Sequence, residues 1–180
     1  MKTITPRFWV LVTLVLVAGA SRLIHLPPNF APIGAIALFG GAYFSNRLQA
    51  FLIPLLAMLL SDIIIGFHNW SVMVSVYGSF TLIVCIGVWI SKNRSILRIA
   101  GTTLSSSILF FAVTNFVVWA TAGGLGYAMT IKGLGDCYIA AIPFFGNTLL
   151  GDAFYTFVLF GGFALMEYRI PQLREARATA

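Results

Sequence analysis

Six apolar segments separated by short polar connections dominate this chain of 180 residues. A helix rises about 1.5 Å per residue, so roughly 20 apolar residues are needed to cross a hydrocarbon core of about 30 Å. Only 9% of the residues are charged and 59% are hydrophobic, which leaves too little polar surface to cover a water-soluble globule. The sequence therefore predicts an all-α, polytopic membrane helical bundle in a single domain, with about six spans at residues 8–21, 31–44, 49–67, 72–90, 97–121 and 142–167.

The first two segments are shorter than the others, so we expect them to tilt less, to extend into flanking residues or to lie partly at the interface. The first segment also has features of a signal peptide. Lys2 and Arg7 precede it, and the string Ala18-Gly19-Ala20 resembles a cleavage site. Because the apolar pattern continues through the rest of the chain, we interpret this segment as the first span.

The basic residues predict the orientation of the bundle, because cytoplasmic connections carry an excess of Lys and Arg. With the N-terminus inside, nine of the eleven Lys and Arg residues fall on the cytoplasmic side. Only Arg22 and Lys132 then fall outside. We therefore expect both termini in the cytoplasm. Basic residues confined to short connections also argue against a nucleic-acid partner and indicate a lipid bilayer instead.

Two carboxylates lie within predicted spans, Asp62 and Asp152. Such a group is costly in a membrane and usually faces a partner or a water-filled cavity. Counting along the helices places both near the midplane or in the outer half, where other polar residues also gather, whereas the inner halves are almost wholly apolar. The sequence thus predicts an outward-facing pocket for a small polar or charged solute, with the candidate binding residues Arg22, Asn29, Asp62, His68, Asn115, Trp119, Tyr138, Asn147 and Asp152.

Each candidate also has a purely structural interpretation. Arg22 would pair with a span aspartate to neutralise it, and Asn115 would bridge two helices. Trp119 would belong to the aromatic belt at the membrane interface, and His68 would be a surface residue of the outer face. These alternatives stay open at the level of the sequence.

The two cysteines indicate neither a metal site nor a cofactor. Cys85 lies in an apolar run, and we expect Cys137 in the outer connection before the last span, together with Asp136 and Tyr138. Because the cysteines lack the spacing of metal ligands, we interpret them as two independent thiols.

Five strings distributed over residues 21–163 are more specific than general hydrophobicity: RLIHLPPNFAPIG at 22–34, ALFGGAYF at 37–44, LSDIIIGFH at 60–68, FFAVTNFVVW at 110–119 and CYIAAIPFFGNTLLGD at 137–152. They resemble a bacterial family of six-helix transport proteins that is uncharacterised in function. The resemblance implies a multi-pass protein of the bacterial inner (cytoplasmic) membrane.

That family is similar in layout to the substrate-binding S components of energy-coupling-factor (ECF) vitamin transporters, which bind a vitamin or metal ion from outside. The similarity implies an uptake protein whose partners are a small-molecule solute and an energising transport module or a second copy of the chain. Those S components often carry alanines four apart on the first helix. Here Ala18 is followed four residues later by Arg22, which departs from that docking pattern.

Two other classes of function remain open. In an intramembrane enzyme, Asp62 and Asp152 would act as an acid/base pair in which one acid stays protonated, because two like charges cannot both ionise at close range. In a membrane scaffold, the buried charges would only lock the packing of the helices. A carboxylate separation near about 3 Å would favour the enzyme. A cavity between the carboxylates would favour solute binding. Because we expect Asp62 toward the outer boundary and the two carboxylates need not share a depth, we expect a binding protein and not an enzyme.

Overall fold

The computed structural model describes residues 5–67, 69–121 and 126–174, which form helices and connections and contain no strand. The all-α prediction is confirmed. The helices are α1 (Pro6–Ala20), α2 (Ile33–Tyr43), α3 (Arg47–Ile65), α4 (Trp70–Ile90), α5 (Ile96–Ala120) and α6 (Ile131–Thr156). α6 continues through the π-helical turn η2 (Phe157–Gly161) into α7 (Gly162–Arg169). Two short 3-10 turns, η1 (Ser21–Leu23) and η3 (Pro171–Leu173), follow α1 and α7.

In the described part of the chain, five helices are long and apolar enough to cross a membrane, when α1 with η1 and α6 with η2 and α7 are each counted as one helix. Their outer surfaces carry large apolar side chains that water would not solvate, such as Leu97, Leu150 and Phe157, with exposed fractions of 86%, 63% and 77%. A continuous apolar exterior of this kind is stable in lipid. The protein is therefore a helical membrane protein.

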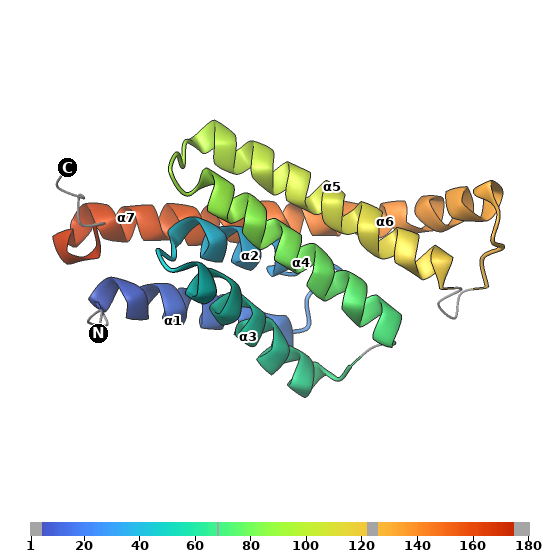
Figure 1. Ribbon diagram of the computed structural model, residues 1–180, viewed down its shortest axis with the longest axis horizontal. Helices are drawn as coiled ribbons and strands as arrows, with labels where there is room; N and C mark the ends of the chain where they lie inside the picture. The colour runs from blue at the N-terminus through green and yellow to red at the C-terminus, as the bar shows by residue number, and fades with distance from the viewer. Residues whose placement is uncertain (1–4, 68, 122–125, 175–180) are drawn as a thin grey trace.

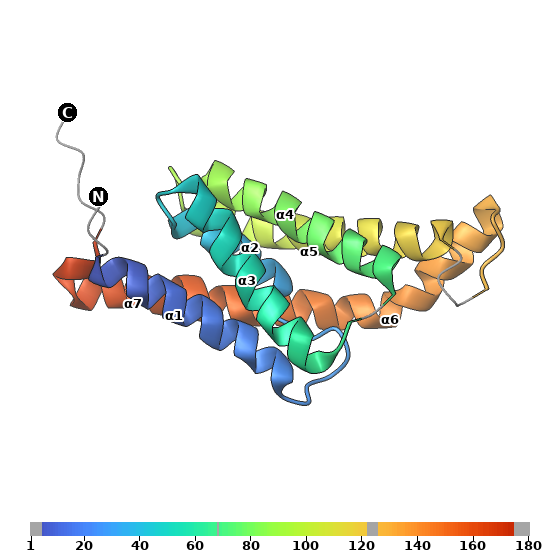
Figure 2. The ribbon, with the colours of Figure 1, turned by 60° about the horizontal axis from the view of Figure 1, so that its bottom comes forward.

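α2 differs from the other helices because it is short and almost completely buried. Its eleven residues rise about 16 Å, roughly half of the hydrocarbon thickness. Ten of the eleven are buried, and α2 packs against α1, α3, α4, α5 and α6 in the middle of the bundle (Figure 1 and Figure 2). The predicted span at 31–44 is thus a helix, but other helices and not lipid surround it.

Glycines bring α2 and α4 unusually close together. A Cβ atom built on Gly41 of α2 would lie 2.9 Å from the Cα atom of Gly87 on α4, closer than real Cβ contacts. Small residues at such crossings let two backbones approach each other inside a membrane. The largest fully buried side chains of the core are Phe39, Phe80 and Phe163.

α6, η2 and α7 form one continuous helix of 39 residues, Ile131–Arg169, which begins eleven residues before the predicted span at 142. Thr130 caps its first turn by accepting a hydrogen bond from the backbone N–H of Gly133. Asp136, Cys137 and Tyr138 therefore lie on a helix, and their expected place in a connection was wrong. At about 58 Å the helix exceeds the bilayer core, and together with α5 it forms a hairpin that projects beyond the bundle (Figure 1).

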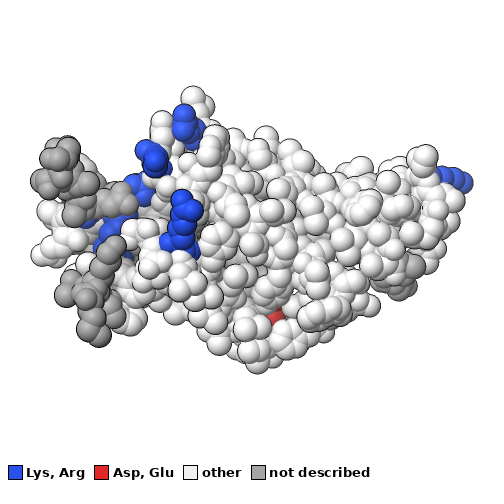
Figure 3. All heavy atoms as spheres, in the orientation of Figure 1, with Lys and Arg blue, Asp and Glu red and all other residues white. Residues whose placement is uncertain are grey.

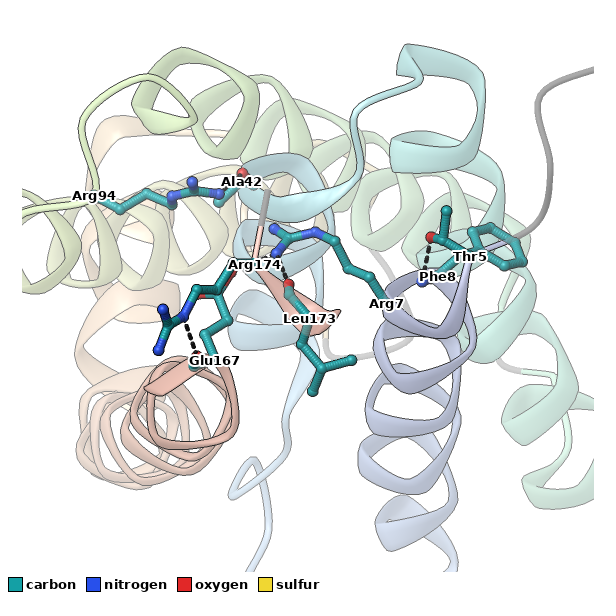
Figure 4. Close-up of polar contacts among 8 residues, drawn as sticks. All are labelled: Thr5, Arg7, Phe8, Ala42, Arg94, Glu167, Leu173 and Arg174. Carbon is teal, nitrogen blue, oxygen red and sulfur yellow. Dashed lines mark hydrogen bonds and ion pairs between the residues drawn. The ribbon is translucent and has the colours of Figure 1, made fainter. Parts of the chain in front are cut away.

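α1 begins and α7 ends at the same end of the bundle (Figure 1). Arg7 on α1 pairs with the Glu167 carboxylate on α7 and donates to the Leu173 carbonyl (Figure 4). Most of the visible Lys and Arg atoms gather at this end (Figure 3), which we call the basic end. An ion pair between the first and last helices thus closes the bundle here.

Candidate functional site

A cavity of about 280 Å³ lies among the connection after η1 and helices α2 to α6. Arg22 and Asn29 reach it from η1 and the following connection, and Asp62 and Asp152 reach it from α3 and α6. Its volume is close to the lower limit of pockets that hold small ligands. The structure brings four of the nine candidate residues together around this cavity, and its walls also include Val76, Phe110 and Thr148.

Asp62 lies in the last turn of α3, where it forms an ion pair with Arg22. A guanidinium nitrogen (Nη2) of Arg22 lies 2.7 Å from the Asp62 carboxylate, whose other oxygen accepts a hydrogen bond of 2.7 Å from the Tyr77 hydroxyl on α4. The two charged side chains are only 13% and 7% exposed. The pair neutralises both charges, as the structural interpretation of Arg22 predicted, and it does so in the cavity wall.

Further hydrogen bonds donated by Arg22 connect the end of α1 to α3. Its Nη1 group donates to the Ser61 hydroxyl and, at 3.3 Å, to the Met58 carbonyl oxygen. Ser21, next to Arg22, donates to the Tyr155 hydroxyl on α6 at 2.8 Å. η1 is therefore held on both sides, and the Arg22 guanidinium occupies a fixed position at the cavity.

Asp152 is 3% exposed and sits against the N-terminus of α2. Its carboxylate accepts a 2.6 Å hydrogen bond from the Ser107 hydroxyl on α5, and the backbone N–H groups of Gly34 and Ala35 also donate to it. Pro32 at the N-cap of α2 provides no side-chain cap, so Asp152 supplies that function from another helix. Glycine at 34 allows this close approach, because a Cβ atom there would lie 2.6 Å from a carboxylate oxygen and would force the Asp152 side chain to shift.

The connection that carries Asn29 is stiff and anchored. Pro27 and Pro28 precede Asn29, whose φ of 64° is in the left-handed region that asparagine tolerates better than most residues. The side-chain amide of Asn147 on α6 donates to the Pro28 carbonyl oxygen at 2.9 Å. Asn147 therefore positions the segment at the cavity without lining the cavity itself.

Three further candidates lie on the α5–α6 hairpin and not around the cavity. The Asn115 amide donates to the Phe111 carbonyl of its own helix. The Trp119 indole donates to the Ala128 carbonyl, and the Tyr138 hydroxyl donates across the hairpin to the Ala112 carbonyl on α5. The contacts of Trp119 and Tyr138 hold the hairpin together, whereas the Asn115 amide bonds within α5 and does not bridge two helices. The remaining candidate, His68, lies outside the described residues.

Sequence reasoning missed three hydroxyl groups that organise the site. Ser61, Ser107 and Tyr77 bind Arg22, Asp152 and Asp62 respectively. The available signal was weak, because hydroxyl groups occur throughout these apolar helices and often bond to a carbonyl one turn earlier, as Thr114 does. The pairing depends on which faces meet, and the sequence does not contain that information explicitly.

Each carboxylate has its own partners, Arg22 and Tyr77 for Asp62 and Ser107 with the α2 amides for Asp152. The cavity combines these fixed polar groups with apolar walls, an arrangement typical of small-molecule sites. Among the described residues, no group of three or more His, Cys, Asp or Glu side chains is arranged to hold a metal ion.

Comparison with known proteins gives a family but no relative with an assigned activity. No curated protein and no solved structure matches the chain. The model of the family of unknown function DUF6580 matches residues 2–173, so the protein belongs to that family.

Proposed function

We propose that this protein is a small-molecule uptake protein that binds a polar or charged solute in the cavity between Arg22, Asp62 and Asp152. The observation that carries the proposal is a cavity lined by the two buried carboxylates, Asp62 and Asp152, and by the Arg22 side chain, which is only 13% exposed. Intramembrane carboxylates are expensive and mark solute or ion pathways. A cavity of about 280 Å³ suits a solute of modest size.

The direction of uptake follows from the charge distribution. The positive-inside rule supports a cytoplasmic location for the basic end, and we propose that both ends of the chain lie on that side of the membrane. Helices that begin and end at one side require an even number of crossings. α2, extended by the connection before it, supplies the returning segment between α1 and α3, and the total becomes six. The cavity lies at the ends of α1 and α3 that are farther from the basic end, so in this orientation it faces outward.

The separate partners of the two aspartates favour binding over catalysis. In an acid/base dyad, two carboxylates share a proton and their mutual repulsion raises the pKa of one of them. Here Arg22 already neutralises Asp62, while Asp152 is occupied in capping α2. A simple scaffold would not need a cavity between these groups. We therefore propose a binding protein and not an enzyme.

The proposed location is the bacterial inner membrane, in keeping with the resemblance to transport proteins of S-component layout. Release of a solute from a buried site requires part of the bundle to move. We propose that an energising transport module or a second copy of the chain drives that movement.

Native mass spectrometry of the purified protein tests the proposal by detecting a co-purifying small molecule. We expect it on the parent protein and on Asp136→Asn, a control on the same helix that does not line the cavity. We expect it to be lost from Asp152→Asn. Because Asp152 also caps α2, Asn29→Gly is the second test, since glycine accepts the positive φ while the lining side chain is removed.

Retention of the molecule in folded Asp152→Asn and Asn29→Gly proteins would refute this site. Equal loss from Asp136→Asn would also refute it, because the effect would then not depend on the cavity.

A further inference from the structure

A second cavity, of about 400 Å³, lies at the basic end, at the opposite end of α2 from the solute cavity. It is formed where α2 ends, α3 begins and α4 ends. Three cationic side chains line it: Arg47, Lys92 and Arg94. The described residues that line it include no carboxylate. The first turn of α3 also presents the positive end of a helix dipole here, which adds to the preference for an anion.

An apolar groove of about 780 Å³ adjoins this basic cavity. It runs between α5 and the continuous helix of α6 and η2, and its walls include Ile99, Leu104, Leu150 and Phe157. Leu104 and Leu150 are more than half exposed, so the groove opens toward the surface that contacts lipid. An apolar groove in this position admits a hydrocarbon chain.

Arg94 joins the two sites because it lines both of them. Its guanidinium lies 4.5 Å from the centre of the Tyr43 ring, which also lines the groove, and donates to the Ala42 carbonyl at 3.1 Å (Figure 4). These contacts hold a positive charge where the apolar groove meets the basic cavity. The combined site therefore has the shape and polarity of an amphiphile with an anionic head.

We propose that an anionic phospholipid binds here, with its phosphate among Arg47, Lys92 and Arg94 and one acyl chain in the groove between α5 and α6. Basic cavities between membrane helices recognise anionic headgroups by the same chemistry. The lipid would fill the space between α5 and α6 beside Asp152 and would brace that helix pair. This proposal uses residues distinct from those of the solute cavity and does not depend on the proposed uptake function.

The test measures the affinity of the detergent-purified protein for phosphatidylglycerol and for phosphatidylcholine with identical acyl chains, by lipid titration in native mass spectrometry. We expect tighter binding of phosphatidylglycerol. Arg47→Ala and Lys92→Ala should each weaken it about fivefold and leave phosphatidylcholine unchanged, because each removes one cation near the headgroup. Both side chains are exposed, so neither change disturbs the core.

Arg98→Ala is the matched control, because Arg98 is an exposed basic residue close to the same end that stacks on Trp89 and does not line the basic cavity. It should leave the affinity for phosphatidylglycerol unchanged. Ala100→Trp places an indole in the groove and should weaken binding of both lipids.

Three outcomes would overturn the proposal. Equal affinity for the two lipids would remove the headgroup selectivity. Equal losses in Arg98→Ala and Lys92→Ala would reduce the effect to general surface charge. A free-phosphate site would be identified instead if inorganic phosphate competed for the site as well as the intact lipid does and if Ala100→Trp left lipid binding unchanged.

Discussion

The ion pair between Arg22 and Asp62 gives the sharpest test of how this bundle tolerates charge. Removing one partner of a buried pair costs roughly 3–5 kcal/mol, because the other charge stays buried without compensation. The Arg22 guanidinium would keep Ser61 and the Met58 carbonyl as acceptors, and Asp62 would keep the Tyr77 hydroxyl as a donor. We therefore expect the lower limit, about 3 kcal/mol, for each of Asp62→Ala and Arg22→Ala.

The double variant should cost much less than the sum of the single variants, because it leaves neither charge behind. We expect about 3 kcal/mol for Arg22→Ala/Asp62→Ala in place of an additive total of about 6, a coupling of about 3 kcal/mol. For a chain of this size, about 3 kcal/mol corresponds to a fall in Tm of roughly 6–12 °C. Thermal unfolding in detergent, followed by tryptophan fluorescence, measures these shifts.

Arg98→Ala serves as the control for loss of a basic side chain, because Arg98 is exposed and should shift the Tm little. Additive losses in the double variant, within about 0.5 kcal/mol, would show that the pair is not coupled and would refute the reasoning. An unchanged Tm in either single variant would refute it equally.

Three further predictions concern packing and hydrogen bonding, all measured as Tm in the same detergent. Gly34→Ala should lower stability by about 1–3 kcal/mol, since its Cβ would lie 2.6 Å from an oxygen of the Asp152 carboxylate; no loss would contradict the close approach. Gly87→Ala should also lower the stability of the protein by about 1–3 kcal/mol, because its Cβ would clash with the α2 backbone. In the control Gly78→Ala, on the same helix, the new Cβ meets nothing within 4 Å, so the change should be neutral or stabilising. Equal effects of the two substitutions would contradict the close crossing of α2 and α4. Tyr77→Phe should cost about 1–3 kcal/mol because the α3 carboxylate loses a donor, and a stability equal to the parent would show that this hydrogen bond contributes nothing.

The sequence predicted the candidate residues in the cavity wall through the cost of burying them. Asp62 and Asp152 stand out in apolar helices, and Arg22 stands out as one of two basic residues on the expected outer side. Asn115, Trp119 and Tyr138 looked equivalent to them by depth, yet Trp119 and Tyr138 hold the α5–α6 hairpin together and the Asn115 amide bonds within α5. Depth in the membrane can be counted along a helix, whereas the neighbour that a side chain faces depends on how each helix is rotated.

α2 also shows which features the sequence could predict and which depended on packing. Its apolar composition predicted a helix at 31–44 but is equally compatible with a helix in lipid and a helix in a protein core. The residues from 131 to 141, which include two glycines and several polar side chains, were expected in a connection, yet they form the first turns of a continuous helix. Packing against α5 overrides that local preference, since tertiary contacts stabilise a helix more than intrinsic propensity does.

By itself, the sequence determined a helical membrane bundle, a basic end and two span aspartates that need partners, because hydrophobicity and charge act residue by residue. The tertiary structure alone decided that Arg22 pairs with Asp62, that Asp152 caps α2 from another helix, and that α2 lies in the core. It also placed three basic side chains beside an apolar groove. These features join residues far apart in the chain, and only the packing of one helix against another fixes which of them meet.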